Sequence, residues 1–201
     1  QNFALRNTII GYNTAKLLLG NNNQYCNDNL IIGNQAAEKL ELLSNNTLIG
    51  SKSNAKESKH SLLLQYNTFI GSKSGYNNSG SNNILLGFSV GTNLSSSNNI
   101  FIGNEAGVLT QGEKNIFIGH QSGINNTTGT KNIFIGINDY ENKYNMSNYT
   151  GNDNLYMGYN SGLENNGNNN LFLGNLSARY LNGNDNIILG KNACYGYNEN
   201  D

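Results

Sequence analysis

One short pattern of polar and apolar positions recurs along almost the whole chain. Each copy reads Asn, then Thr, Ile or Leu, then a large apolar residue, then Ile, Leu or Met, and finally Gly. Clear copies are residues 99–103, 115–119 and 132–136. The apolar triplet is β-branched or aromatic and lies between Asn and Gly, a pattern that predicts a short β-strand.

About eleven copies are present, and their spacing indicates the fold. Successive copies lie 16 or 17 residues apart, except at three places where the interval is 21 or 22. Such a period is too short for a pair of packed helices, whose repeats run to about 34 residues. We therefore predict an all-β fold, a parallel β-solenoid or β-roll of about eleven coils, with two short strands and two turns in each coil. It forms a single domain over residues 1–201.

A second half-repeat follows each glycine. Two variable residues lead to a pair of small residues, such as Ala106-Gly107 or Ser122-Gly123, and a polar turn then returns to the next Asn. Three coils are longer than the others, near residues 12–28, 51–66 and 137–153. Solenoid insertions form loops on one side, often the binding side.

The third insertion contains three tyrosines among polar residues. Tyr140, Tyr144 and Tyr149 combine an apolar ring with a hydroxyl group, which suits contacts with carbohydrate or protein. They are candidate ligand residues, although a tolerated insertion without a ligand explains the segment as well.

Asparagine makes up 44 of the 201 residues. Regularly placed Ile, Leu and Phe distinguish the chain from a disordered Asn-rich tract, because they supply surface that folding can bury. In stacked coils each repeat Asn can bond the same Asn above and below, as in amide ladders. The predicted ladder contains Asn83, Asn99, Asn115, Asn132, Asn154, Asn170 and Asn186.

The two faces of each strand are both apolar. Positions two and four of the repeat point one way and position three points the other. We expect positions two and four to fill the coil against the small pair, which leaves position three as an apolar stripe along the rod. Other copies of the chain, packed about a common axis, would cover this stripe. The alternative is a wide coil whose second strand covers it. The predicted oligomer interface is Phe69, Phe101, Phe117, Phe134, Tyr156 and Phe172.

Charge and composition exclude several partners. The net charge is −1 and only 12% of residues are charged, so no basic field attracts nucleic acid or an anionic membrane. The apolar runs are far shorter than a membrane span, so we expect no membrane insertion. Cys26 and Cys194 lie near opposite ends of the rod, too far apart for an intrachain disulfide. They could join successive rods end to end into a filament.

No pattern of catalytic residues stands out. The two histidines, His60 and His120, are isolated, and no Ser/His/Asp order, paired cysteines or phosphate-binding loop is present. Asp28, Asp153 and Asp185 each precede a repeat Asn, where turn capping is a better explanation than calcium binding. We therefore expect no enzyme activity, no metal and no cofactor.

The repeat units resemble known fibre repeats. Residues 99–107 and 119–129 look like repeats of phage and giant-virus tail-fibre-like proteins, and they are similar to the head repeats of trimeric autotransporter adhesins. The resemblance implies a homotrimeric left-handed β-roll at the cell surface, outside the cell or on a virion, which binds a host glycan or protein. Adhesin heads usually have a small residue where this chain has Phe, so the trimer geometry is expected to differ.

Two functional hypotheses follow from the sequence. The first is a structural or adhesive fibre module built from several copies of the chain. The alternative is an ice-binding or carbohydrate-binding solenoid. Ice binding needs a regular array of Thr on an exposed face, and position two has Thr only at Thr8, Thr47 and Thr68.

Overall fold

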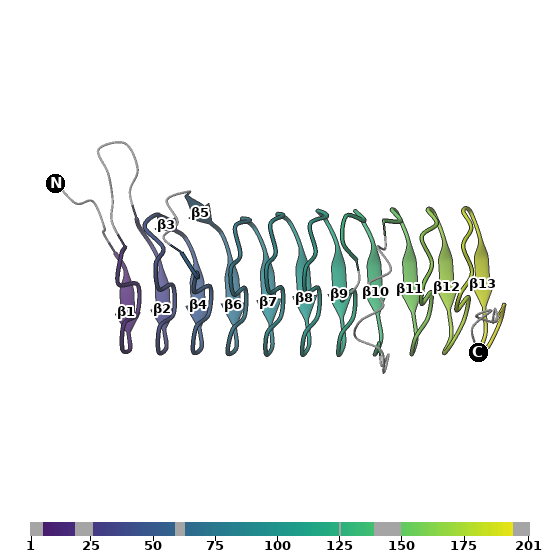
Figure 1. Cartoon of the computed structure of the whole chain (residues 1–201), viewed down its shortest axis with the longest axis horizontal. Helices are drawn as coiled ribbons and strands as arrows, with labels where there is room; N and C mark the ends of the chain where they lie inside the picture. Colours follow the sequence, from purple (N-terminus) through teal and green to yellow (C-terminus); the bar gives the residue numbers. More distant parts are fainter. Residues whose placement is uncertain (1–5, 19–25, 59–62, 125, 139–149, 195–201) are drawn as a thin grey trace.

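Short parallel strands stack one above another along the whole molecule. The structure is a computed structural model, and it describes residues 6–18, 26–58, 63–124, 126–138 and 150–194. In these residues the secondary structure consists of strands and turns, without a helix. Figure 1 shows the strands of the main sheet side by side, in nearly the same orientation, from β1 to β13, with β3 and β5 outside this row. The predicted parallel β-solenoid is confirmed.

Eleven strands form one parallel sheet, in which they follow one another in chain order. Each has three residues, namely β1 (Thr8–Ile10), β2 (Leu30–Ile32), β4 (Thr47–Ile49), β6 (Thr68–Ile70), β7 (Ile84–Leu86), β8 (Ile100–Ile102), β9 (Ile116–Ile118), β10 (Ile133–Ile135), β11 (Leu155–Met157), β12 (Leu171–Leu173) and β13 (Ile187–Leu189). Equivalent residues pair at every step, so that Phe101 lies opposite Phe117. At about 4.8 Å between strands, eleven coils make a rod about 50 Å long.

A second strand in every coil was predicted, and this was wrong. In the described residues only β3 (Leu43–Ser44) and β5 (Leu64–Gln65) form a second, two-stranded parallel sheet. Elsewhere the second half of the coil is a run of turns. The coil that follows β6 has three overlapping turns, Gly71–Ser74, Lys73–Tyr76 and Gly75–Asn78, each closed by a hydrogen bond from its fourth N–H to its first carbonyl.

Left-handed residues make these overlapping turns possible. The third residue of each turn after β6 has a positive φ, of 55°, 61° and 59° in chain order. A type II turn requires a positive φ at this position, which Gly and Asn adopt most easily. The two variable residues and the small pair of the half-repeat are therefore successive turn positions.

The middle residues of the strands fill the interior of the coil. Ile31, Leu48, Phe69, Leu85, Phe101, Phe117, Tyr156, Phe172 and Ile188 are all buried, and most are completely inaccessible. Phe134 is partly buried and packs against the core on both sides. The prediction that position three forms an exposed stripe and an oligomer interface was therefore wrong for Phe69, Phe101, Phe117, Phe134, Tyr156 and Phe172. The alternative of a coil whose second half covers position three is correct, although turns rather than a strand cover it.

Five aromatic rings form one continuous stack inside the coils. Phe101, Phe117, Phe134, Tyr156 and Phe172 have centroid separations of 4.7–4.9 Å and interplanar angles of at most 16°. Their spacing follows the strand spacing, and it suits offset-stacked rings. The Tyr156 hydroxyl donates to Asn165 Oδ1 at 3.1 Å, so the only hydroxyl in the stack has a partner.

The small pair makes room for these rings. A Cβ added to Gly107 would lie 2.3 Å from the ring of Phe101, and Gly75, Gly123 and Gly162 face the rings of their own coils in the same way. Where the strand carries an aliphatic residue, a residue with a side chain can take this place, as Ala37 does in the coil of Ile31. Phe172 with Ala178 departs from this rule.

The asparagine ladder runs the length of the rod. At each of the ten steps between Asn7 and Asn186, the backbone N–H of the repeat Asn donates to Oδ1 of the repeat Asn one coil earlier, at 2.9 or 3.0 Å. Amide-to-amide bonds join only some of the pairs, such as Asn154 Nδ2 to Asn132 Oδ1 at 3.1 Å. The predicted ladder is confirmed, and its constant bond is from backbone to side chain.

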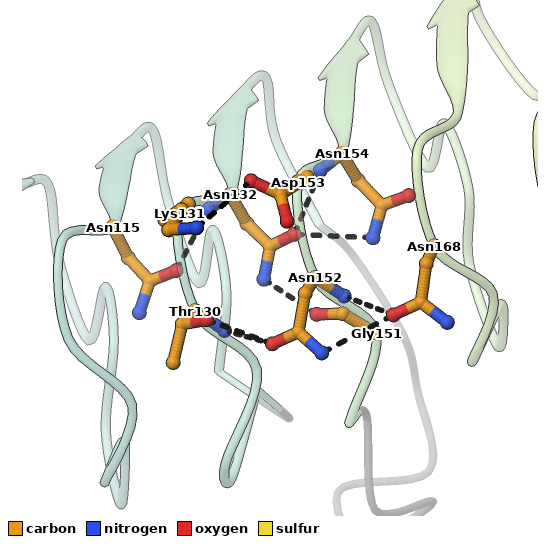
Figure 2. A network of polar contacts seen from close by, with 9 residues as sticks. All are labelled: Asn115, Thr130, Lys131, Asn132, Gly151, Asn152, Asp153, Asn154 and Asn168. Atoms are coloured by element: carbon orange, nitrogen blue, oxygen red, sulfur yellow. Dashed lines mark hydrogen bonds and ion pairs between the residues drawn. The ribbon is translucent and has the colours of Figure 1, made fainter.

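The ladder provides hydrogen-bond partners for backbone N–H groups that the short strands leave unpaired. The residue before each Asn has a positive φ, 62° at Lys114 and 57° at Lys131, so regular strand geometry begins only at the Asn. The Asn oxygen replaces the main-chain carbonyl that a longer strand would supply. Its Nδ2 reaches the turn that follows, as in the 2.8 Å bond from Asn132 to the carbonyl of Gly151 (Figure 2).

A second ladder lies two residues before the first and runs in the opposite direction. The backbone N–H of Thr130 donates to Oδ1 of Asn152 in the next coil at 2.8 Å, and Asn152 donates to Asn168 at 2.9 Å. Figure 2 shows the two ladders side by side. Ser81 and Ser97 play the same part near the middle of the rod. Sequence reasoning missed this ladder because its position varies among Asn, Ser, Thr, Gln and Glu.

Changing Asn115 to Ala should destabilise the rod by about 2–4 kcal/mol. The change removes the acceptor of the buried Asn132 N–H and the donor to the Gly129 carbonyl, and each unsatisfied buried group costs about 1–3 kcal/mol. Urea denaturation followed by circular dichroism measures the loss. Asn104→Ala is the matched control, because Asn104 is exposed and should change stability by less than about 0.5 kcal/mol. Equal losses at the two positions would contradict the ladder's role.

Gly107 and Phe101 should be coupled energetically. Gly107→Ala places a methyl group against the ring of Phe101 and gives a side chain to a residue with a φ of 62°. We therefore expect a loss of about 3 kcal/mol in the free energy of unfolding. The double variant Gly107→Ala/Phe101→Leu pairs an aliphatic side chain with Ala, as Ile31 is paired with Ala37. Its loss in free energy of unfolding should be smaller than the sum of the two single losses by about 1 kcal/mol or more, as measured in a double-mutant cycle. Additive losses would show that ring size does not select Gly here.

Candidate interaction surface

The outward side of the large sheet forms a continuous apolar surface, which we call the strand face. It consists of the first and third residues of the eleven strands, because the middle residues point inward. The first residues are Thr8, Leu30, Thr47, Thr68, Ile84, Ile100, Ile116, Ile133, Leu155, Leu171 and Ile187. The third residues are Ile10, Ile32, Ile49, Ile70, Leu86, Ile102, Ile118, Ile135, Met157, Leu173 and Leu189.

Side chains on the strand face are partly or fully open to solvent. Along the middle of the rod most are half-buried, because equivalent residues on the neighbouring coils, about 4.8 Å away, cover their flanks. Ile84 and Met157 are 40% and 44% exposed, and Ile187 in the last strand is 73% exposed. The expected apolar stripe therefore exists, but positions two and four form it instead of position three.

The strand face has no charged residue. Three of its residues are Thr and the other nineteen are Ile, Leu or Met. Taking its width as about 10 Å and its length as about 50 Å, its area is about 500 Å². That value is in the upper part of the range for the largest apolar patch on a monomer, and such patches often have a function.

Four exposed side chains widen the strand face on one edge. They are Tyr12, Phe88, Ile137 and Tyr159, which each directly follow a repeat glycine and are 72%, 50%, 50% and 38% exposed. Ile137 and Tyr159 belong to neighbouring coils, next to Ile135 and Met157 of the strand face. Sequence analysis treated these positions as variable, because most other coils have a polar residue there.

Polar residues border the other edge of the strand face. The Asp28 carboxylate forms an ion pair with the Arg6 guanidinium, which donates a hydrogen bond to it at 2.8 Å. The Asp153 carboxylate lies 3.7 Å from the Lys131 ammonium group (Figure 2). Asp185 accepts from Asn169 Nδ2 at 3.1 Å. All three aspartates occupy the left-handed position before a ladder Asn, as expected of turn residues. These pairs are exposed, so each contributes little to stability.

A small cavity lies inside the coil that contains β10. Its volume is about 50 Å³, and Phe134, Tyr156, Asn126, Asn138 and Ser161 contribute to its lining. This is room for a few water molecules and far less than an ordinary small-molecule site. The candidate ligand residues Tyr140, Tyr144 and Tyr149, which follow this coil's strand, lie outside the described residues.

The two cysteines differ in their access to a neighbouring rod. Cys26 is fully buried, and its thiol donates to the carbonyl of Glu41 at 3.3 Å. Burial raises the pKa of this thiol, which makes it a poor nucleophile for disulfide exchange. Cys194 is exposed. A disulfide from Cys26 to a second rod would require the first coils to rearrange, which argues against the predicted end-to-end link.

The described ranges contain neither a metal-binding cluster nor a membrane-spanning helix. No group of three or more His, Cys, Asp or Glu residues is arranged there to hold a metal ion. No helix in the same ranges is long and apolar enough to cross a membrane. His60 lies outside the described residues and His120 is half-buried on the coil after β9.

Polar groups interrupt the interior near the second insertion. The side-chain amides of Asn54 and Asn78 are completely buried, and within the described part of the chain neither has a hydrogen-bond partner. Lys56 is also buried; its ammonium group donates to the carbonyl of Asn77 at 3.0 Å, and burial lowers its pKa to about 8. These groups make this segment the least favourable part of the core.

Comparisons with known proteins find no relative. No protein-family model, no curated protein and no solved structure matches the chain.

Asn78→Leu should stabilise the rod by about 1–2 kcal/mol. Asn78 lies seven residues after its repeat glycine, and Leu40 and Leu94 occupy that place, fully buried, in other coils. The change removes an amide buried without a partner and replaces it with an apolar group of similar size. Denaturant titration compares it with Asn104→Leu, an exposed change that should not stabilise. A loss of stability at position 78 would contradict this account.

Proposed function

We propose that this chain is a structural module of a fibre outside the cell, on the cell surface or on a virion, built from several copies of itself. It has no catalytic role in this proposal. The observation that carries it is the unbroken stacking of eleven coils, each tied to the next by the same backbone and Asn bonds. Such a rod resists bending because every coil has the same hydrogen-bonded neighbours.

Surface chemistry supports the same proposal. The molecule has a net charge of −1, an exposed apolar strand face and no group of metal-ligating residues in the described ranges. The resemblance of the repeat to tail-fibre-like and adhesin-head repeats favours a homotrimer. In this proposal, the Tyr-rich insertion at residues 139–149 would bind a host glycan or protein.

The ice-binding alternative has less support. Its required array would have to lie on the strand face, where position two is exposed. Thr47 and Thr68 are neighbours there, but Leu30 separates them from Thr8, and the remaining residues are Ile, Leu or Met. A regular lattice of hydroxyl groups is therefore absent from the described strand face.

Purified protein at about 20 μM should sediment as a complex with a mass that is a multiple of 21.9 kDa. Electron micrographs of the same sample should show straight rods at least about 50 Å long, since eleven coils of about 4.8 Å set the minimum length. Dilution to about 0.1 μM is the internal control for weak association. A compact monomer at every concentration would contradict the proposal.

A further inference from the structure

We propose that the strand face is the surface through which copies of this chain pack together about a common axis, with their strand faces turned toward one another. The inference rests on the proposed function, because it names the partner and the contact surface of that assembly. The partner is a second copy of the chain. No other protein or ligand is required to cover the face.

The strand face is large enough to form a specific interface with its equivalent on another copy. Two strand faces of about 500 Å² each would bury about 1,000 Å² in total, the value that a specific interface should reach. Phe88, Ile137 and Tyr159 add apolar surface at one edge, and exposed aromatic residues of this kind are frequent binding hot spots. Packing along only part of the rod would fall below this area, so the contact should extend over most of the coils.

Spacing is the second argument. The strand face repeats the same two rows of side chains at the strand separation of about 4.8 Å. A surface that interlocks with these rows over eleven coils must have the same period and must also be straight. Figure 1 shows little change in strand direction along the rod, as expected of a sheet whose strands are joined by a side-chain ladder. A second copy meets both requirements at once.

Charge is the third argument. No residue of the strand face is charged, so two such faces can meet without burying an unpaired charge. Oppositely charged residues border the face, among them Arg6 in the first coil and Asp185 in the last. Rows of Ile and Leu that interdigitate between paired sheets form dry, closely packed interfaces.

The test places two lysines at the centre of the strand face. Ile100 belongs to β8, the sixth of the eleven strands, and Ile133 belongs to β10. In Ile100→Lys/Ile133→Lys both charges would be buried in the contact. Sedimentation velocity at about 20 μM should then give a 21.9 kDa monomer, whereas the unchanged chain gives two or three copies. We expect association to weaken by at least about 100-fold, which corresponds to about 2.7 kcal/mol.

Two controls keep the outcomes separate. Ser95→Lys/Gln111→Lys adds the same charge at exposed turn positions outside the strand face and should leave the complex intact. Far-ultraviolet circular dichroism and thermal unfolding should show that the strand-face variant still folds, because Ile100 and Ile133 point outward. A folded strand-face variant that assembles like the unchanged chain overturns this inference and leaves the fibre proposal standing. An unchanged chain that is itself a monomer overturns the fibre proposal as well.

Discussion

Each coil has to provide hydrogen-bond partners for the backbone of the next coil, and the rest of the structure depends on this requirement. Strands of three residues supply too few main-chain hydrogen bonds to join coils by themselves. The repeat Asn extends them, because its carboxamide accepts from the next coil's N–H and donates to the following turn. A carboxylate could accept but not donate, and it would bring a charge into the interior. This explains why Asn is found at the same place in all eleven coils while nearly every other polar position varies.

Stacking of equivalent residues also determines the composition of the chain. A side chain inside the coil lies against its own counterpart about 4.8 Å away, so like charges would repel along the whole rod. Aromatic rings, aliphatic groups and amides tolerate such neighbours, whereas charged groups lie mainly at edges and turns, where Arg6 can meet Asp28, with the buried Lys56 as an exception. The low charge content and the high Asn content are therefore two results of one geometry. Insertions are accepted because a loop can leave the coil between two ladder positions without disturbing the pairing of β10 with β11.

The repeat length, the strands and the ladder could be predicted from the sequence, but the direction of the strand faces could not. A strand with apolar residues on both sides shows which residues share a face without showing which face lies inside. The prediction placed the two aliphatic positions inside the coil against the small pair, and the structure reverses this arrangement. A partial signal was present within the chain: coils with Phe69, Phe101 or Phe117 have Gly in the small pair, whereas the coils of Ile31 and Leu48 have Ala37 and Asn54. Leu85 with Gly91 and Phe172 with Ala178 do not follow this pairing, so the correlation alone could not decide the face, although the structure shows the contact. The second ladder and the consecutive turns gave no comparable signal, because Asn, Ser, Thr and Gly are common throughout the chain.

Reversing the strand faces strengthens the case for self-association. A single aromatic row on the outside could be covered by a neighbouring loop, and its burial would need little area. The observed arrangement hides the aromatic row and exposes two aliphatic rows, Ile116 and Ile118 with their equivalents, which together are wider and equally regular. Aliphatic side chains on one face of an eleven-stranded sheet can neither donate nor accept hydrogen bonds with water or a polar ligand. Their regular spacing also limits the partners that can pack along the full rod to surfaces with the same strand separation. In the proposed assembly, the feature that makes the coil stable, the exact repetition of one short strand, also makes the chain complementary to itself.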